Sequence, residues 1–104
     1  AATAFRIRSN ENLLRQSTPI NIEADSLNAA ILAPDVEPGS ELWRLFVREV
    51  TREVTQKSGQ KCTAVRRIMV PHDRISDLQQ DLCEELATRV VGNPFDESVN
   101  VGPL

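Results

Sequence analysis

Two short apolar runs, 28–33 and 64–70, flank a long amphipathic segment in the middle of this 104-residue chain. Across that segment apolar residues recur at spacings of three and four, as they do on one face of a helix: Trp43, Phe46, Val47, Val50 and Val54. Ser40 is the expected N-cap of this helix, and Gly59 marks its expected end. A strand, a helix and a second strand in this order favour a parallel pair joined by a helical crossover. The sequence therefore predicts an α/β fold with a largely parallel sheet flanked by helices.

A second amphipathic helix is predicted after the run 64–70. Its apolar stripe has the same helical spacing and consists of Ile75, Leu78, Leu82, Leu86 and Val90. Asp73 or Ser76 is the expected N-cap, and Gly92 marks the expected end. The segment 93–104 is punctuated by Pro and Gly, so we expect it to be a loop.

The N-terminal part of the chain has weaker patterns. Residues 1–16 are predicted to form a frayed helix that breaks near Ser9 and Asn10, with 13–14 in a second short helical piece. Residues 19–23 alternate apolar and polar side chains, which predicts a strand with one buried face.

The composition excludes several classes of protein. Lys and Arg number 12 against 15 Asp and Glu, and a net charge of -3 has the wrong sign for a phosphate-binding surface, so we expect no nucleic-acid partner. No apolar run reaches the ~18 residues that a membrane helix needs, so we expect no membrane association. Two cysteines are too few for a secreted disulfide framework and fit a reducing compartment, which predicts a cytoplasmic protein.

Cys62 is the first candidate for chemistry, because it lies between the predicted helix and the following strand, where functional residues are often found. Gly59 before it permits unusual backbone angles, and the adjacent Lys61 is placed to favour the thiolate. The alternative is that Cys62 is a small buried hydrophobic residue. Cys83 lies inside the second predicted helix with no base or turn beside it, and we interpret it as structural.

Glu23 is the second candidate, because it ends the predicted strand 19–23 and a carboxylate at a strand end can face a crevice. The alternative is a solvated acid in a loop, an interpretation that also applies to Asp25 and Ser26. His72, the single histidine, is interpreted as a surface turn residue. No residues at ligand spacing accompany it, so we expect no metal site.

Three motifs along the chain carry a specific resemblance. The segment GQKCTA at 59–64 matches the pattern G-Q-x-C-x-A at every fixed position, and VGNPFD at 91–96 with the closing GPL at 102–104 matches G-x-P-x-D followed by G-P-L. Glu23 lies 39 residues before Cys62. In these motifs and their order the chain resembles the aldehyde dehydrogenase superfamily, whose nucleophile lies in the first motif and whose general base precedes it at about this separation.

The longer segments NIEADSLNAAILAPDV and SGQKCTAVRRIMVP resemble one branch of that family, the ring-cleavage branch of bacterial phenylacetate degradation. One departure from the wider family lies beside Glu23. Most members have Leu-Gly-Gly-Lys after the general base, whereas here Ala24, Asp25, Ser26 and Leu27 follow. The glycines that let the backbone pass close to the nicotinamide in the wider family are therefore missing, as is expected for this branch.

The resemblance implies a role for each candidate residue. Cys62 is the implied nucleophile that attacks an aldehyde, and its backbone N–H is an implied donor to the oxyanion. Glu23 is the implied general base that activates the hydrolytic water. The resemblance also implies NAD or NADP as the hydride acceptor and a semialdehyde carrying a coenzyme A thioester as the substrate.

The resemblance further implies that residues 1–104 are a fragment of an aldehyde dehydrogenase catalytic domain. The family's cofactor-binding strands precede the position of Ala1, so we expect no NAD or NADP to bind this chain, and we expect the isolated chain to be inactive. We also expect a homo-oligomer, because family catalytic domains assemble partly through sheet edges. The alternative is a non-catalytic oligomerisation or partner-binding module of the same ancestry.

Overall fold

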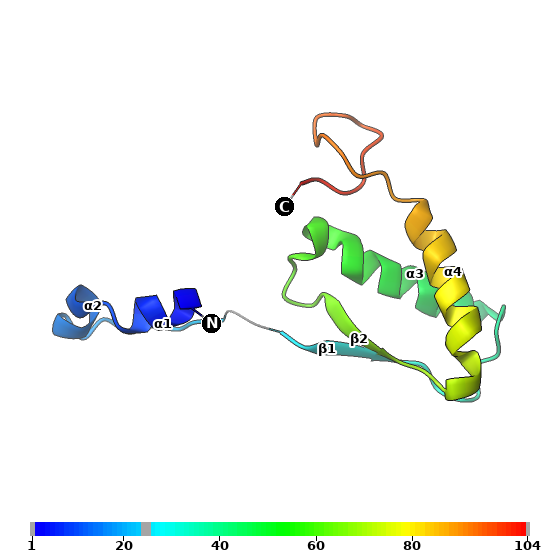
Figure 1. Ribbon diagram of the computed structural model, residues 1–104, viewed down its shortest axis with the longest axis horizontal. Helices are drawn as coiled ribbons and strands as arrows, with labels where there is room; N and C mark the ends of the chain where they lie inside the picture. The colour runs from blue at the N-terminus through cyan, green and yellow to red at the C-terminus, as the bar shows by residue number, and fades with distance from the viewer. Residues whose placement is uncertain (1, 24–25, 104) are drawn as a thin grey trace.

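The computed structural model describes residues 2–23 and 26–103. Figure 1 shows two strands side by side, with two long helices on one side of the sheet. In chain order the elements are α1 (Ala2–Arg8), α2 (Glu11–Arg15), β1 (Asn28–Ile31), α3 (Glu41–Thr55), the 3₁₀ turn η1 (Gln56–Gly59), β2 (Val65–Met69), the 3₁₀ turn η2 (His72–Arg74) and α4 (Ile75–Ala87).

The strands β1 and β2 pair in parallel, and the segment between them that contains α3 is the crossover. Ile31 lies opposite Met69, and the ladder continues to Leu32, whose N–H donates to the Met69 carbonyl at 2.9 Å. Each strand lies within one of the two predicted apolar runs, β1 in 28–33 and β2 in 64–70. The predicted α/β fold with a parallel pair is therefore confirmed.

The segment 19–23 is irregular in the structure, so the strand predicted there is wrong. A strand is stable only when its backbone N–H and C=O groups pair with a neighbouring strand. The sheet built by the described residues consists of β1 and β2. Ile20 and Ile22 are half-buried and Glu23 is exposed, so the alternation of burial is present without a paired strand.

Helix α3 begins where the sequence predicts it. The Ser40 side chain accepts a hydrogen bond from the Trp43 N–H at 3.2 Å, which satisfies one of the free donors of the first turn. The helix ends at Thr55, earlier than the predicted Gly59. The cause is Gln56, whose ψ of 132° takes the backbone out of the helical region.

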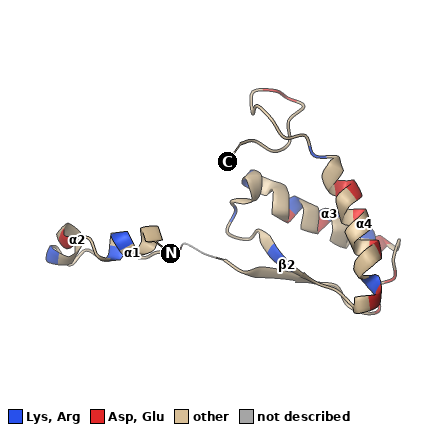
Figure 2. Ribbon diagram, viewed as in Figure 1, with Lys and Arg blue, Asp and Glu red and all other residues tan. Residues whose placement is uncertain are grey.

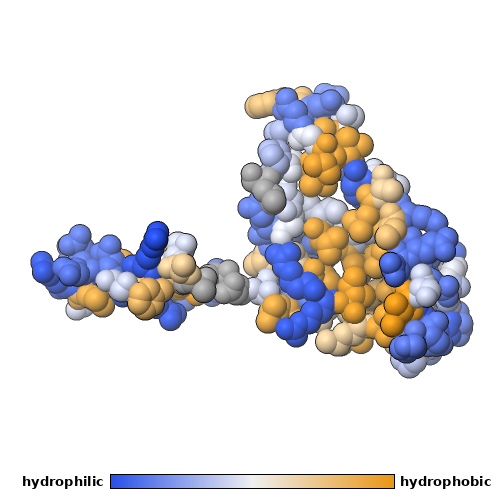
Figure 3. Space-filling view, viewed as in Figure 1, coloured by the Kyte–Doolittle hydropathy of each residue, from blue (hydrophilic) through white to orange (hydrophobic). Residues whose placement is uncertain are grey.

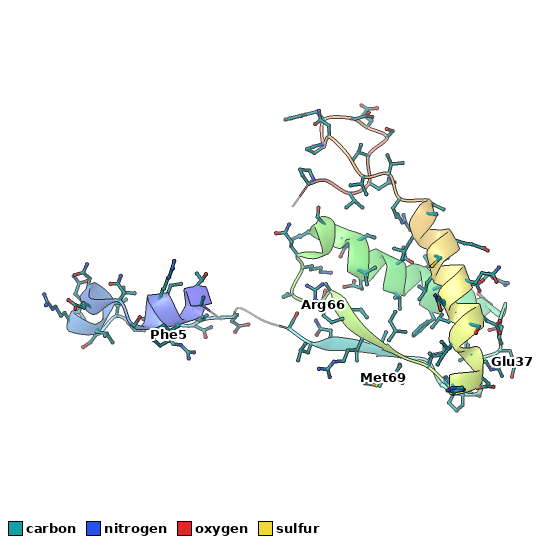
Figure 4. The ribbon with its side chains drawn as sticks, viewed as in Figure 1. Phe5, Glu37, Arg66 and Met69 are labelled. Carbon is teal, nitrogen blue, oxygen red and sulfur yellow. The ribbon has the colours of Figure 1, made fainter. Side chains whose placement is uncertain are left out.

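Helix α4 begins differently from the prediction, because neither Asp73 nor Ser76 is its N-cap. Pro71 and the turn η2 lead directly into the helix, and the cap residue Arg74 makes no capping bond with its side chain. The Arg74 guanidinium donates instead to both carboxylate oxygens of Glu37, at 2.8 and 3.0 Å. This pairing holds the pKa of Glu37 below its ordinary value. Figure 4 shows Glu37 beside the start of α4.

The hydrophobic core lies between the carboxyl ends of the strands and the first halves of α3 and α4. The Trp43 indole N–H donates to Asp81 Oδ2 of α4 at 2.5 Å, so the polar atom of this buried ring has an acceptor. The buried cluster consists of Leu32, Trp43, Val47 and Leu78, and the side chains packed against it are Val36, Phe46, Val70 and Leu82.

The predicted apolar stripe of α4 is only partly buried. The helix ends at Ala87 rather than at Gly92, so the last residue of the predicted stripe, Val90, lies beyond the helix. The stripe residues that remain exposed are Ile75, Leu86 and Val90. Figure 3 shows hydrophobic side chains gathered over this part of the molecule.

The face of the sheet opposite the helices is open within the described residues. Ile31 is 71% exposed and Met69 is 47% exposed, although the two lie side by side in the sheet. Figure 4 shows Met69 projecting away from α3 and α4. Among the described residues, α3 and α4 cover one face of the sheet and no helix covers the other.

The N-terminal residues form two short helices, α1 and α2, with the break near Ser9 and Asn10 that the sequence predicts. The Asn10 side chain caps α2 by accepting bonds from the N–H groups of Asn12 (3.0 Å) and Leu13 (3.3 Å). Neither helix has a buried residue, and Phe5 is 73% exposed. Figures 1 and 4 show this arm outside the body formed by the sheet, α3 and α4.

Trp43→Ala is expected to lower the free energy of unfolding by about 3–5 kcal/mol, because Trp43 is 1% exposed and fills the centre of the core. The matched control is Leu42→Ala on the same helix turn. Leu42 is 63% exposed, so its loss should stay within about 0.5 kcal/mol. Chemical denaturation of both variants measures the difference, and equal losses would contradict the placement of the core.

Candidate active site

Cys62 lies in a tight turn between η1 and β2. The turn is closed by the Ala64 N–H, which donates to the Lys61 carbonyl at 3.0 Å. Ala64 is fully buried and anchors the turn to the body, whereas Cys62 is an exposed free cysteine. The alternative interpretation of Cys62 as a buried hydrophobic residue is therefore wrong for this structure.

The backbone before the turn adopts a conformation that few residues tolerate. Lys57, Ser58 and Gly59 have φ values of 51°, 55° and 73°, all in the left-handed region. At Gly59 an added Cβ would come within 3.1 Å of the Val54 carbonyl oxygen, so both the angle and the space require glycine. Left-handed residues other than glycine persist only where their surroundings hold them.

Helix α3 holds the turn through Glu53. The Thr63 hydroxyl donates to Glu53 Oε2 at 2.7 Å, and Lys61 Nζ lies 3.5 Å from Glu53 Oε1. The hydrogen bond from Thr63, together with the charge of Lys61, lowers the pKa of Glu53. Lys61 also donates to Gln56 at 2.8 Å. The ammonium that the sequence placed beside the thiol is thus paired with a carboxylate of α3.

The sheet and the C-terminal segment hold the turn from the other sides. Asn28, the first residue of β1, donates from Nδ2 to the carbonyl of Cys62 at 2.6 Å and to that of Ala64 at 3.3 Å. The Ser58 hydroxyl donates to the Gly102 carbonyl at 2.9 Å. Arg66, at the start of β2 in Figure 4, donates to the Gly59 carbonyl at 3.0 Å. Contacts from several segments thus fix a turn whose thiol faces solvent.

Glu23 is exposed and accepts a bond from the Asn21 side chain at 3.4 Å. Among the described residues it makes no hydrogen bond with the Cys62 turn. Five positions later the chain reaches Asn28, which does contact that turn. The neighbouring candidate Asp25, together with Ala24, lies outside the described residues.

Sequence reasoning missed the residues that hold the turn, which are Asn28, Glu53, Ser58 and Thr63. A polar first residue in an otherwise apolar strand was the available signal for Asn28, because such a side chain needs a partner. Glu53 and Thr63 carried no signal, since nothing in the sequence tells which helix face meets a distant turn.

The remaining candidates lie apart from Cys62. His72 is exposed in η2, as the sequence predicts, and Cys83 is an exposed free cysteine on α4. Within residues 2–23 and 26–103, no three His, Cys, Asp or Glu side chains gather to hold a metal ion. No helix in the described part of the chain is long and apolar enough to cross a membrane.

A groove of 570 Å³ lies between α3 and α4, on a different part of the surface. Arg44 and Arg48 line it from α3, and Glu84 and Glu85 line it from α4. Figure 2 shows acidic residues recurring along α4. The groove contains no residue of the Cys62 turn, so it is not part of the candidate active site.

The aldehyde dehydrogenase family model matches residues 2–104 of this chain. The chain belongs to the aldehyde dehydrogenase family. Its structure, with helices on a parallel pair of strands, is consistent with part of an aldehyde dehydrogenase domain.

Individual aldehyde dehydrogenases are also similar to this chain. The 3,4-dehydroadipyl-CoA semialdehyde dehydrogenase of Aromatoleum evansii is 50% identical over all 104 residues, which cover 20% of that protein. An aldehyde dehydrogenase of Staphylococcus haemolyticus is 37% identical over 57 residues, 55% of this chain and 12% of that protein. A homologue of aldehyde dehydrogenase family 7 member A1 from Dictyostelium discoideum is 31% identical over 83 residues, 80% of this chain and 15% of that protein. The chain thus spans a fifth or less of the length of these relatives.

Protonation of Glu53 in acid is expected to weaken the contacts that hold the Cys62 turn. Glu53→Gln is expected to abolish this dependence on pH. Because folding lowers the pKa of Glu53, its contribution is present above the ordinary value of 4.5 and is lost as the pH falls through the lower folded value. Amide hydrogen exchange of Ala64, whose N–H closes the turn on the Lys61 carbonyl, measures the effect when it is corrected for the intrinsic rate and followed across this pH range. The protection should fall in acid for the unsubstituted protein and lose this dependence in the variant.

The matched control is Glu49→Gln, which removes an exposed pair with Arg52 (2.8 Å) on the same helix and leaves the turn untouched. The exchange of its Ala64 amide should follow that of the unsubstituted protein. An identical acid dependence in the Glu53 and Glu49 variants would contradict the role of Glu53.

Proposed function

We propose that the protein containing this chain oxidises an aldehyde to a carboxylic acid, with Cys62 as the nucleophile and NAD or NADP as the hydride acceptor. The observation that carries the proposal is an exposed free thiol on a turn that is anchored from α3, from β1 and from the C-terminal segment. A nucleophile has to be accessible and fixed in position at once, because misplacement of a reacting atom costs rate steeply. Membership of the aldehyde dehydrogenase family supports the same reaction.

Cys62 would act first. Its thiolate forms a bond to the aldehyde carbon, and the carbonyl oxygen becomes the oxyanion of a thiohemiacetal. A nicotinamide cofactor, when bound, would supply the hydride acceptor through which this adduct becomes a thioester on Cys62. The Cys62 amide N–H donates to no acceptor among the described residues, so it is available to the oxyanion.

Glu23 would act second, as the general base that removes a proton from the water attacking the thioester. The new carbon–oxygen bond then replaces the bond to sulfur, and the acid leaves as Cys62 is regenerated. The exposure of Glu23 leaves its carboxylate accessible to a water molecule, and the resemblance to the aldehyde dehydrogenase family supports this role.

We assign none of the described residues to the binding of NAD or NADP. Phosphate-binding turns of dinucleotide sites need closely spaced glycines. The glycines of this chain are isolated from one another, at positions 39, 59, 92 and 102. These residues do not fit a dinucleotide site of that kind.

We propose a semialdehyde linked to coenzyme A as the substrate. The support is the 50% identity to a 3,4-dehydroadipyl-CoA semialdehyde dehydrogenase over the whole chain. The proposal agrees with the resemblance to the ring-cleavage branch of phenylacetate degradation. NADP or NAD as the hydride acceptor remains a prediction from that resemblance, and the cytoplasmic location remains a prediction from the cysteine content.

A homo-oligomer is proposed on a separate observation. The open sheet face presents exposed Ile31 and Met69, and β1 and β2 are both edge strands within the described residues. Apolar faces and unpaired edges favour contact with another protein surface. The same observation favours the alternative, a non-catalytic module for oligomerisation or partner binding, which differs from the proposed enzyme in not requiring Cys62.

Cys62→Ser is expected to lower aldehyde oxidation by the full-length protein on the order of 10⁴-fold, because the covalent intermediate cannot form efficiently on an unactivated hydroxyl. Reduction of NAD or NADP with a coenzyme A semialdehyde measures the rate. The matched control is Cys83→Ser, which removes the other exposed thiol and should leave the rate unchanged. Retained oxidation in the Cys62 variant would favour the non-catalytic module.

Glu23→Gln is expected to lower steady-state turnover by about 10²–10⁴-fold while a first burst of reduced cofactor remains, because thioester formation does not need the base and hydrolysis does. Stopped-flow absorbance separates the burst from the steady state. The control is Glu11→Gln, which removes an exposed carboxylate on α2 paired only with Arg15. Unchanged turnover in the Glu23 variant would identify Glu23 as a solvated surface acid.

A further inference from the structure

Asn28 is a half-buried polar residue at the point where β1 begins. Its amide nitrogen donates to the Cys62 carbonyl at 2.6 Å and to the Ala64 carbonyl at 3.3 Å. An amide NH₂ has two hydrogens, so these two acceptors use its whole donor capacity. The Asn28 side chain therefore donates only to the backbone of the turn that carries the Cys62 thiol.

These two bonds act on the part of the turn that determines where the thiol points. The Ala64 N–H already closes the turn on the Lys61 carbonyl at 3.0 Å, which fixes the peptide before Cys62. The bond from Asn28 fixes the carbonyl of Cys62 and so the peptide after it. With both flanking peptides held, the Cα–Cβ bond of Cys62 and its amide N–H have defined directions.

An irregularity in the sheet lies at the same place. Asn28 pairs with Val65, but Ala29 pairs with Arg67, so Arg66 is an extra residue in β2. Such bulges bend a strand and redirect its side chains, and they are frequent beside active sites. Here the bulge lets β2 start next to Asn28 while the Arg66 guanidinium reaches back to the Gly59 carbonyl at 3.0 Å.

We propose that Asn28 is a positioning residue for the nucleophile, which acts by holding the carbonyls on either side of Thr63 so that the Cys62 thiol and N–H meet the substrate in one fixed geometry. The inference rests on the proposed function and deepens it, since it names a residue that neither the family motifs nor the proposed steps include.

The proposed role of Asn28 depends on the two hydrogen-bond donors of its amide group. A substitution that keeps the size of the side chain but removes these donors can therefore test it. Asn28→Asp keeps the size of the side chain but turns both donors into a carboxylate facing two carbonyl oxygens. Asn28→Ala removes the donors without adding charge, and Asn28→Ser retains one shorter donor. The burst rate of reduced cofactor in the full-length protein is expected to fall about tenfold or more in the Asp and Ala variants, with KM little changed and the Ser variant intermediate.

The matched control is Asn10→Asp. Asn10 uses its side-chain oxygen as an acceptor for the N–H groups of Asn12 and Leu13, and a carboxylate accepts them equally well. This variant carries the same change of charge and should keep the burst rate. Thermal unfolding of each variant separates a loss of fold from a loss of position. Should the Asp variant fail to fold, the Ala and Ser pair gives the same comparison.

The outcomes separate the inference from the function on which it rests. If Cys62→Ser inactivates the protein but Asn28→Ala leaves the burst rate unchanged, the role of Asn28 is overturned and the proposed function stands. Oxidation that survives Cys62→Ser overturns the proposed function. Exchange of the Ala64 amide, which closes the turn on the Lys61 carbonyl, is a measurement that needs no activity. Faster exchange in Asn28→Ala than in Asn10→Asp supports the inference, and equal exchange overturns it.

Discussion

The parallel pairing of β1 with β2 is the interaction on which the rest of this structure depends. Parallel strands need a crossover, and the one used here contains α3, so the pairing fixes which side of the sheet the helix covers. It brings Leu32 and Val70 to one end of the sheet, where Trp43 and Leu78 complete the core. At the other end the same register places Asn28 against the backbone of the Cys62 turn.

The two ends of the sheet therefore differ in what they contact: one end packs into the core and the other holds the Cys62 turn. At the carboxyl end apolar side chains are buried, and the indole of Trp43 is the one large ring in the cluster. At the amino end of β2 polar groups hold a left-handed backbone segment and a turn with an exposed thiol. Left-handed residues such as Lys57 and Ser58 are held by their surroundings rather than by preference. The hydrogen bonds accepted by Glu53 and Gly102 and the one donated by Asn28 therefore give the turn its shape.

The sequence predicted the elements that depend on local patterns. Helical spacing located α3 and α4, apolar runs located β1 and β2, and Ser40 marked a true N-cap, since spacing and capping act within a few residues. It failed where a distant partner decides. Residues 19–23 alternate like a strand but have none to pair with in the described part of the chain. The start of α4 was also mispredicted, for a local reason: Pro71 and a 3₁₀ turn lead into the helix, so Arg74 rather than Asp73 or Ser76 is its cap residue.

For the candidate active site, the sequence by itself determined which residue is the nucleophile candidate and where it stands in the chain, between a helix and a strand. The G-Q-x-C-x-A motif also pointed to the family that the comparison then established. Only the tertiary structure decided that the Cys62 thiol is exposed, that Lys61 turns to Glu53, and that Asn28 holds the Cys62 carbonyl. The reason is physical: motif residues are neighbours in sequence, whereas the groups that fix a turn come from wherever the fold places a donor or a charge within about 3 Å of it.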